Sequence, residues 1–232
     1  MITRFSADAT NLIELLGVGA VPRPTDLDQS KTGFEKLVSL RIYTFSQGQT
    51  IHGEAEGDEV VIVFLQGSLS ITVTGEGTKT WEISGRESVF AGPVQAVYLP
   101  PRCSYRLELH TDAQVAYARA RAEGRFPPRL LESRRQSKNG VEVRQILGPN
   151  EGEALECHEF ILSTGSAYDL PGEAETLTHY RLESANALYA DSTSVETMLE
   201  GADTIGATEP YTVTTPKGKL YGLTFLVQVG KT

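Results

Sequence analysis

The arrangement of apolar residues between positions 60 and 74 constrains the fold of this chain more than any other feature. Residues 60–65 form a continuous apolar run rich in Val and Ile, which is typical of a strand buried on both faces. Residues 68–74 alternate polar and apolar side chains, as a strand with one solvated face does. Gln66 and Gly67 lie between the two runs and predict a tight hairpin turn. A packed antiparallel sheet is therefore expected here.

The same texture recurs along most of the chain and predicts an all-β protein. Short runs punctuated by Gly and Pro are typical of a sandwich or a barrel. Helical spacing of apolar residues predicts two short helices, at residues 11–16 and 194–201. We expect further strands at residues 37–45, 79–83, 88–90, 96–99, 105–109, 115–119, 155–162, 175–182, 185–190, 211–214 and 220–229.

The segment between residues 123 and 152 interrupts this pattern. Pro127 and Pro128 lack the backbone amide that a sheet ladder needs, and residues 133–140 are polar and basic. The sequence therefore predicts two β domains in tandem. We place the N-terminal domain at residues 1–126, a wrapped linker at residues 127–152 and a shortened C-terminal domain at residues 153–232.

Charge and composition exclude several classes of protein. The net charge of -9, from 30 acidic and 21 basic residues, argues against a nucleic-acid-binding protein, because such proteins concentrate basic surface. Cys103 and Cys157 are too few and too far apart for a disulfide framework or a metal knuckle. The apolar stretch at residues 12–18 is too short for a membrane span and lacks the features of a signal peptide. We expect a cytoplasmic protein that binds neither nucleic acid nor membranes.

Several stretches carry a more specific resemblance. Residues 85–93 read GRESVFAGP and are followed by AVYLPP at residues 96–101. Together with residues 57–67, 143–149 and 159–165, they resemble the 5-deoxy-glucuronate isomerase family of inositol breakdown. That family is related to the 5-keto-4-deoxyuronate isomerases and belongs to the cupin superfamily. The resemblance implies a bicupin fold, in which two tandem β-barrels or jelly rolls are joined by a wrapped linker.

The resemblance also implies where metal ligands should stand. A cupin barrel places a His-x-His pair, a glutamate and a further histidine around a divalent metal. In the first half, His52 and Glu54 stand at the first motif as His-x-Glu, and Tyr105 stands at the position of the last histidine. In the second half, the His-x-His segment is missing, Thr176 replaces the metal glutamate and Leu220 replaces the last histidine. We therefore expect no metal and no other cofactor, although the family would hold a divalent metal.

The second domain offers candidate site residues of its own. His158 alternates with Phe160, so it is a hydrogen-bonded core histidine, a metal ligand or a general base. Glu175 and His179 share a strand face and form an acid/base pair if that face lines the barrel, whereas the family register points the alternate residues inward. The candidate catalytic residues are His158, Glu175 and His179, and the candidate substrate-binding residues are Tyr180, Arg181 and Tyr221.

Two functions stay open. The first is a divergent sugar-acid isomerase that interconverts an aldose and a ketose in myo-inositol catabolism, as the resemblance implies. The second is a non-catalytic bicupin that binds a carbohydrate or metabolite as a sensor or structural partner, because a fold can persist after its site is lost. Either would take a sugar acid or a related metabolite, and edge strands would allow a homodimer. Arg86 and Glu87 are expected to form a structural ion pair or to support a turn between the barrels.

Overall fold

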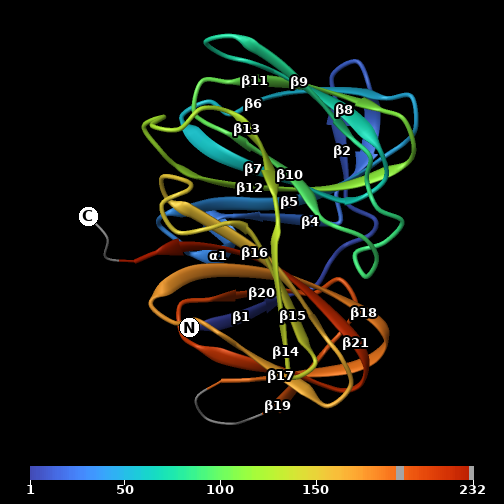
Figure 1. The fold of residues 1–232 in the computed structure, drawn as a ribbon, viewed down its shortest axis with the longest axis vertical. Helices are drawn as coiled ribbons and strands as arrows, with labels where there is room; N and C mark the ends of the chain where they lie inside the picture. The colour runs from blue at the N-terminus through green and yellow to red at the C-terminus, as the bar shows by residue number, and fades with distance from the viewer. Residues whose placement is uncertain (192–195, 230–232) are drawn as a thin grey trace.

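β-Sheets build the chain into two lobes, which lie one above the other in Figure 1. The computed structural model describes residues 1–191 and 196–229. Within those residues the elements are strands, except for the short helix α1 (Gln29–Thr32). Asp28 caps the N-terminus of α1, and its side chain accepts hydrogen bonds from the backbone amides of Ser30 and Lys31. No helix in the described ranges is long and apolar enough to cross a membrane.

Two facing sheets form the upper lobe of Figure 1. The larger sheet has the order β13 (Arg129–Glu132), β10 (Gln95–Leu99), β7 (Asp58–Gln66), β12 (Ala113–Arg121), β5 (Leu37–Phe45) and β4 (Thr25–Asp28). The smaller sheet has the order β6 (Thr50–Glu54), β11 (Ser104–Leu109), β8 (Leu69–Thr74) and β9 (Thr78–Ile83). A hairpin of β2 (Leu12–Leu15) and β3 (Gly19–Pro22) packs against the apolar core between them. Alternate residues of facing strands, such as Ile62 of β7 and Ile71 of β8, fill that core.

One large sheet folds over its own core to form the lower lobe. It has the order β1 (Ile2–Phe5), β20 (Thr204–Ala207), β18 (Ala174–Ala190), β21 (Tyr211–Gln228), β16 (Leu155–Leu162), β15 (Val141–Leu147) and β14 (Arg134–Lys138). Strand β17 (Ser166–Leu170) also pairs with β21, and β19 (Glu196–Leu199) also pairs with β18. The pairing of β18 with β21 shifts register after Glu183, which lets these long strands bend. The core of the lower lobe includes Phe160 of β16, Tyr180 of β18 and Val213 of β21.

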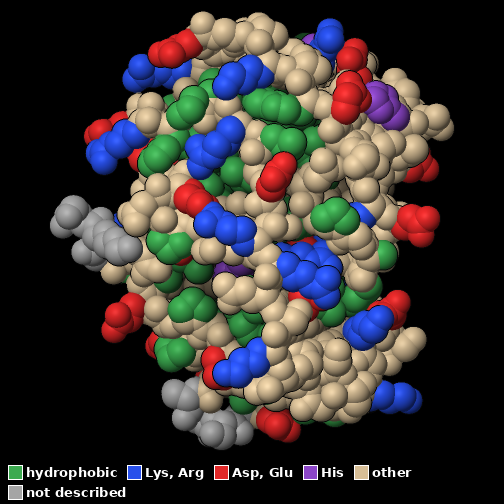
Figure 2. Space-filling model, viewed as in Figure 1, with side chains coloured by type: hydrophobic (Ala, Val, Ile, Leu, Met, Phe, Trp, Pro, Cys, Tyr) green, Lys and Arg blue, Asp and Glu red, His purple; other side chains and the backbone are tan. Residues whose placement is uncertain are grey.

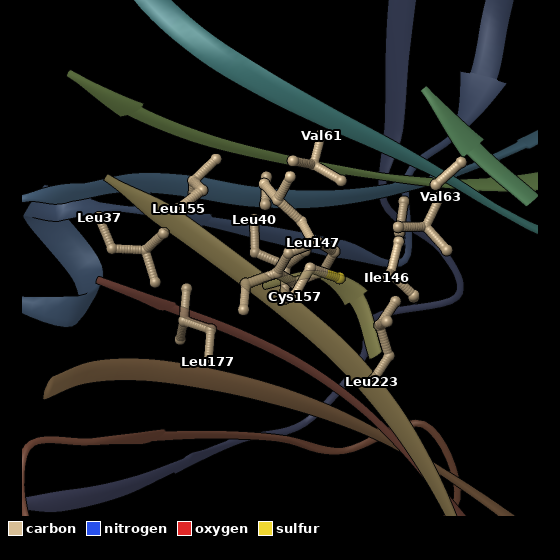
Figure 3. Close-up of a cluster of buried hydrophobic side chains, with 14 of the residues drawn as sticks. Leu37, Leu40, Val61, Val63, Ile146, Leu147, Leu155, Cys157, Leu177 and Leu223 are labelled. Atoms are coloured by element: carbon tan, nitrogen blue, oxygen red, sulfur yellow. The ribbon is translucent and has the colours of Figure 1, made fainter. Parts of the chain in front are cut away.

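A further apolar core joins the two lobes (Figure 3). Val61 and Val63 of β7 reach it from the larger upper sheet, and Cys157 of β16 and Leu223 of β21 reach it from the lower sheet. Alternate residues of β12 on this side are alanine, so little side-chain volume separates the sheets there. Because this core is continuous with strands of both lobes, the lobes bury much of their apolar surface against each other.

Two buried glutamates fasten each lobe to the start of a strand in the other. Glu59 of β7 accepts hydrogen bonds from the backbone amides of residues 153–155, at 2.9, 2.7 and 2.5 Å. Glu175 of β18 accepts them from the amides of residues 35–37, at 2.6, 2.8 and 2.7 Å. Residues 153–155 lead into β16, and residues 35–37 lead into β5. The lobes therefore hold each other by the same device in both directions.

Both helices expected from the sequence are wrong in the described residues. Residues 12–15 form strand β2, because Ile13 and Leu15 pack on the lobe while Leu12 is exposed, which is a period of two. Residues 196–199 form strand β19, which pairs with β18, whereas residues 194 and 195 lie outside the described part of the chain. The strand expected at residues 88–90 is instead a turn, closed by a single bridge between Ser88 and Ala91.

The linker expected at residues 127–152 is more regular than a connector. Strand β13 joins the upper sheet, and β14 and β15 extend the lower sheet. Pro128 is tolerated because it precedes β13, which lies at a sheet edge. Strand β1 also departs from the expected plan, since it pairs with β20 of the lower lobe. The strands expected separately at residues 175–182 and 185–190 are continuous as β18, and those at residues 211–214 and 220–229 as β21.

Candidate functional site

Strand β18 divides the predicted site residues between its two faces. Thr178 and Tyr180 point into the lower lobe, where the Tyr180 hydroxyl lies 2.9 Å from that of Tyr211. Glu175 and His179 lie on the opposite face, toward the upper lobe. The threonine face therefore lines the lobe, as the family register implied, and the predicted acid/base pair does not.

Glu175 is fully occupied by the backbone of the other lobe. Its Oε1 accepts from the amide of Glu35, and its Oε2 accepts from those of Lys36 and Leu37. The side chain is 5% exposed. A carboxylate that accepts three amide hydrogen bonds is a structural anchor, and a catalytic role would require those bonds to break.

Arg181 makes a further contact between the lobes, and His179 supports it. Arg181 Nε donates to His179 Nε2 at 3.0 Å, so the proton of His179 sits on Nδ1 and faces Thr204 Oγ1 at 3.2 Å. Burial, reinforced by the Arg181 charge, holds the pKa of His179 well below its ordinary value. Arg181 also donates to Gln114 Oε1 of β12. His179 is therefore neutral, and the predicted substrate-binding Arg181 spans the two lobes.

His158 faces the interior of the lower lobe, away from Glu175 and His179. Its ring lies against Phe160, and its Nε2 is 3.3 Å from the Tyr168 hydroxyl. Burial lowers the pKa of His158 to about 4. The structure does not bring the three predicted catalytic side chains together, and their catalytic roles stay predictions.

Tyr221, predicted to bind substrate, belongs instead to a buried ionic cluster between the lobes. Its hydroxyl donates to Glu159 Oε2 at 2.9 Å. Arg86 binds both oxygens of Glu159 at 3.0 and 2.9 Å, and Arg144 binds Oε1 at 2.8 Å. The expectation of a structural ion pair at Arg86 is thus met with Glu159 as the partner, and not with the neighbouring Glu87. Burial works against the charge of Arg86, but Tyr221 and Glu159 hold its pKa above the ordinary value.

The histidines do not fit the divalent metal that the family resemblance implies. His52 is exposed on β6, His110 follows β11, His158 lies inside the lower lobe and His179 faces the upper lobe. Within the described residues, no group of three or more His, Cys, Asp or Glu side chains is placed to hold a metal ion. A catalytic site needs about three protein ligands. We therefore derive no chemical step through a metal.

A cavity of about 380 Å³ opens between the two sheets of the upper lobe. Strands β5, β7 and β12 form one wall, and β6 and β11 form the other. His52 and Glu54 are exposed residues of β6 at this cavity, and Tyr105 lies beside them on the neighbouring strand β11. The cavity thus occupies the place where the resemblance puts the first cupin motif. It is lined by Leu15, Ser39, Arg41, Tyr43, Phe45, Ile51, His52, Gly53, Glu54, Glu56, Val60, Tyr105, Tyr117 and Arg119.

Aromatic rings and unused hydroxyl groups give this cavity its chemistry. The Tyr43 and Tyr117 rings meet edge to face at 5.4 Å, and Tyr105 stacks near Tyr117 at 6.0 Å. Among the described residues, the buried hydroxyls of Ser39 and Tyr117 find no hydrogen-bond partner. Buried polar groups are normally paired, so an unpaired hydroxyl at a cavity indicates a site for water or a ligand.

The phenols stay neutral while cationic groups lie close by. Burial raises the pKa of Tyr105, and the nearby Tyr43 adds to this, although the charges of Arg119 and Arg41 oppose it. Burial and the closeness of Tyr105 also raise the pKa of Tyr117 well above its ordinary value. These phenols are therefore hydrogen-bond donors and acceptors at neutral pH, beside the positive charge of the two guanidinium groups.

The cavity residues of β5 and β12 were not predicted from the sequence, although the sequence carries a signal for them. Ser39, Arg41 and Tyr43 alternate on β5, and Tyr117 and Arg119 alternate on β12. Polar residues at a period of two within otherwise buried strands indicate a polar interior face. The pairing of β5 with β12 brings the two sets together, which only the folded chain reveals.

Comparisons with known proteins find the family resemblance in the part of the chain that forms most of the upper lobe. A model of the KduI/IolB family matches residues 23–145. The 5-deoxy-glucuronate isomerase of Geobacillus kaustophilus is 35% identical over 111 residues, which cover 47% of this chain and 38% of that protein. The chain thus aligns with less than half the length of this curated relative.

Solved structures extend the likeness to both lobes. An IolB-like protein from Salmonella typhimurium matches with a TM-score of 0.77 at 19% identity, over 88% of each chain. A mutant oxalate decarboxylase from Bacillus subtilis matches with a TM-score of 0.74 at 11% identity, over 97% of this chain and 77% of that one. At such identities the likeness concerns the fold, which is all-β and of the cupin type, as expected from the sequence.

Proposed function

Since the chain belongs to the KduI/IolB family, we propose that it is an isomerase-like protein that binds a sugar acid or a related metabolite without a cupin metal centre. The observation that carries this proposal is that the predicted site residues make structural contacts, while a different cavity has unpaired hydroxyl groups. Glu175, Arg181 and Tyr221 make hydrogen bonds between the lobes, while the upper-lobe cavity retains hydroxyl groups that bind nothing in the described chain. The fold and a polar cavity persist where the metal ligands do not.

Metal analysis of the purified protein tests the absence of a metal centre. After dialysis against metal-free buffer, we expect far less than one equivalent of Mn, Fe, Ni or Zn per chain, because the histidines are dispersed over both lobes. A control protein with an intact cupin site should keep about one equivalent under the same treatment. One tightly held equivalent in this chain would contradict the proposal.

Active isomerisation is the second candidate, favoured by the relative of Geobacillus kaustophilus that carries the name 5-deoxy-glucuronate isomerase. Aldose–ketose isomerisation moves a proton between neighbouring carbons, and a metal usually stabilises the charge that develops on the oxygens. Without one, several kcal/mol of stabilisation must come from side chains. Incubation of the protein with 5-deoxy-glucuronate, followed by NMR, separates the candidates. We expect no conversion, and turnover that persists in EDTA would establish a metal-independent isomerase instead.

The remaining parts of the proposal concern partners and location. We infer a cytoplasmic protein that forms a homodimer and binds neither nucleic acid nor membranes. The net charge of -9 supports the absence of nucleic-acid binding. On the face drawn in Figure 2, basic side chains are interspersed with acidic ones. Light scattering coupled to gel filtration tests the dimer, and a mass of 25.2 kDa would instead show a monomer.

A further inference from the structure

The wall of the upper-lobe cavity that β5 and β12 form carries two hydroxyl groups with unused hydrogen-bonding capacity. Ser39 on β5 is 2% exposed and Tyr117 on β12 is 6% exposed, and neither hydroxyl has a partner among the described residues. Leaving such a group unpaired is unfavourable, because it has lost its hydrogen bonds to water. Two of them on the same cavity wall indicate that the folded chain is arranged for a polar occupant.

A guanidinium group with free donors lies at the same cavity. Arg41 Nε donates to Asp26 Oδ1 at 3.1 Å, and within the described residues the terminal amino groups of Arg41 make no further hydrogen bond. The Arg41 side chain is 32% exposed, so it lies nearer the mouth than Ser39 and Tyr117 do. An Arg fork of this kind matches the two oxygens of a carboxylate.

The other charged groups limit how much negative charge the cavity accepts. Arg119 is held by Asp58 at 3.0 Å and by the backbone oxygen of Ala55 at 2.6 Å, so most of its donors are used. Glu54 and Glu56 are exposed residues of the lining. A ligand with one negative charge fits this balance, whereas a phosphate dianion would meet the two carboxylates.

The aromatic wall and the volume suit a small ring. Tyr43, Tyr105 and Tyr117 present ring faces and edges to the cavity, and aromatic surfaces pack against the apolar face of a sugar. A cavity of about 380 Å³ lies within the range of small-molecule sites. The lower lobe differs, because Phe160, Tyr168 and Tyr180 pack together in its interior.

We propose that the upper-lobe cavity, and not the interior of the lower lobe, is the ligand site of this protein, and that it takes a polyhydroxylated monocarboxylate. The inference rests on the proposed function for the class of ligand. Arg41 binds the carboxylate at the mouth, and the Ser39 and Tyr117 hydroxyls bind hydroxyl groups of the ligand deeper in the cavity.

Isothermal titration calorimetry with D-glucuronate as the probe tests this assignment in the full chain. Tyr117→Phe removes an unpaired hydroxyl and should fold as well as the wild type, yet bind glucuronate about fivefold more weakly. Arg41→Met should weaken binding about tenfold or more, because a charge-assisted pair is lost. Tyr168→Phe removes a hydroxyl from the lower lobe and is the matched control, with unchanged affinity. Glucose and glucose 6-phosphate should each bind more weakly than glucuronate to the wild type.

The outcomes separate the two proposals. If the wild type binds glucuronate and Tyr117→Phe weakens it while Tyr168→Phe does not, the upper-lobe cavity is the site. If binding is intact in Tyr117→Phe and Arg41→Met but lost in Tyr168→Phe, the site lies in the lower lobe, and the proposed function stands without this inference. If the folded wild type binds no sugar acid, the proposed function itself fails. A cooperative thermal unfolding transition confirms that each variant is folded. If Arg41→Met does not fold, the comparison of Tyr117→Phe with Tyr168→Phe still tests the assignment.

Discussion

At the scale of single residues, two histidines of the lower lobe, the half-buried His158 and the buried His179, tie the stability of the fold to pH. The His158 ring lies 6.4 Å from that of Phe160 and 6.1 Å from that of Tyr168. Burial lowers the pKa of His158 to about 4, whereas in the unfolded chain it is about 6.5. Below about pH 6.5, His158 therefore binds a proton more readily in the unfolded state than in the folded state. The fold therefore loses stability as the pH falls from about 6.5 toward 4.

Replacing His158 by glutamine should weaken this acid sensitivity. Between about pH 7.5 and pH 5, we expect His158→Gln to lose about 2 kcal/mol less unfolding free energy than the wild type. The buried His179 continues to contribute in both proteins. Urea unfolding followed by circular dichroism at the two pH values measures the difference. The control His110→Gln, at an exposed position, should keep the wild-type dependence, and the same dependence in His158→Gln would refute this origin of the acid sensitivity.

At the scale of elements, the sequence predicts strands better than it predicts their continuity. The interiors of β5, β7 and β16 are recognisable because their alternation or continuous apolar character is local. The continuity of β18 and β21 is not, because polar residues near Glu183 and the Pro216–Gly218 region resemble turns. Those segments stay in the ladder only because the two long strands pair with each other across register shifts. Strand β2 was predicted as a helix, because the apolar pattern of four residues is compatible with either structure. Packing of Ile13 and Leu15 against the upper lobe selects the strand.

The candidate site divides in the same way. A polar alternation on β5 and β12 was present in the sequence, and it marks the cavity that the folded chain encloses. The roles of Glu175 and Arg181 were not readable, because their partners at residues 35–37 and at Gln114 are more than sixty positions away. Long-range contacts decide whether a buried charge is an anchor or a catalyst.

A glycine in β21 tests the packing inside the lower lobe. A Cβ atom added at Gly222 would lie 2.2 Å from the Phe160 ring, and Phe160 is fully buried. We expect Gly222→Ala to lower the unfolding free energy by about 1–3 kcal/mol, because the ring cannot move without displacing its neighbours. Gly201→Ala is the control, since its Cβ would meet nothing within 4 Å. Equal thermal stability of the two variants would contradict the close packing of the Phe160 ring against Gly222.

At the scale of the whole molecule, the ionic cluster and the shared core make the two lobes one cooperative unit. Glu159 is 0% exposed and receives hydrogen bonds from Arg86, Arg144 and Tyr221. Arg86 comes from the upper lobe, whereas Glu159 belongs to β16 of the lower lobe. Buried charges are retained only where they are paired, so each lobe depends on the other for this pairing.

Neutralising Glu159 should therefore destabilise both lobes together. We expect Glu159→Gln to cost about 3–5 kcal/mol, because the buried guanidinium of Arg86 loses its counter-charge, whereas Arg144 keeps its pair with Glu142. Calorimetry of the wild type should show one transition, and the variant should unfold at a lower temperature. Glu183→Gln breaks an exposed pair with Lys219, 51% and 54% exposed, and should cost less than about 1 kcal/mol. A variant in which one lobe melts and the other keeps the wild-type midpoint would contradict this coupling.

We propose that the whole molecule keeps the fold of the KduI/IolB family and binds a sugar acid without the metal-binding histidines of a cupin site. Titration of the wild type with D-glucuronate, before and after exhaustive dialysis against EDTA, tests this most directly. We predict the same affinity in both titrations, because Ser39, Arg41 and Tyr117 bind the ligand without a metal. Binding that disappears on chelation and returns with added Mn²⁺ or Zn²⁺ would contradict the proposal.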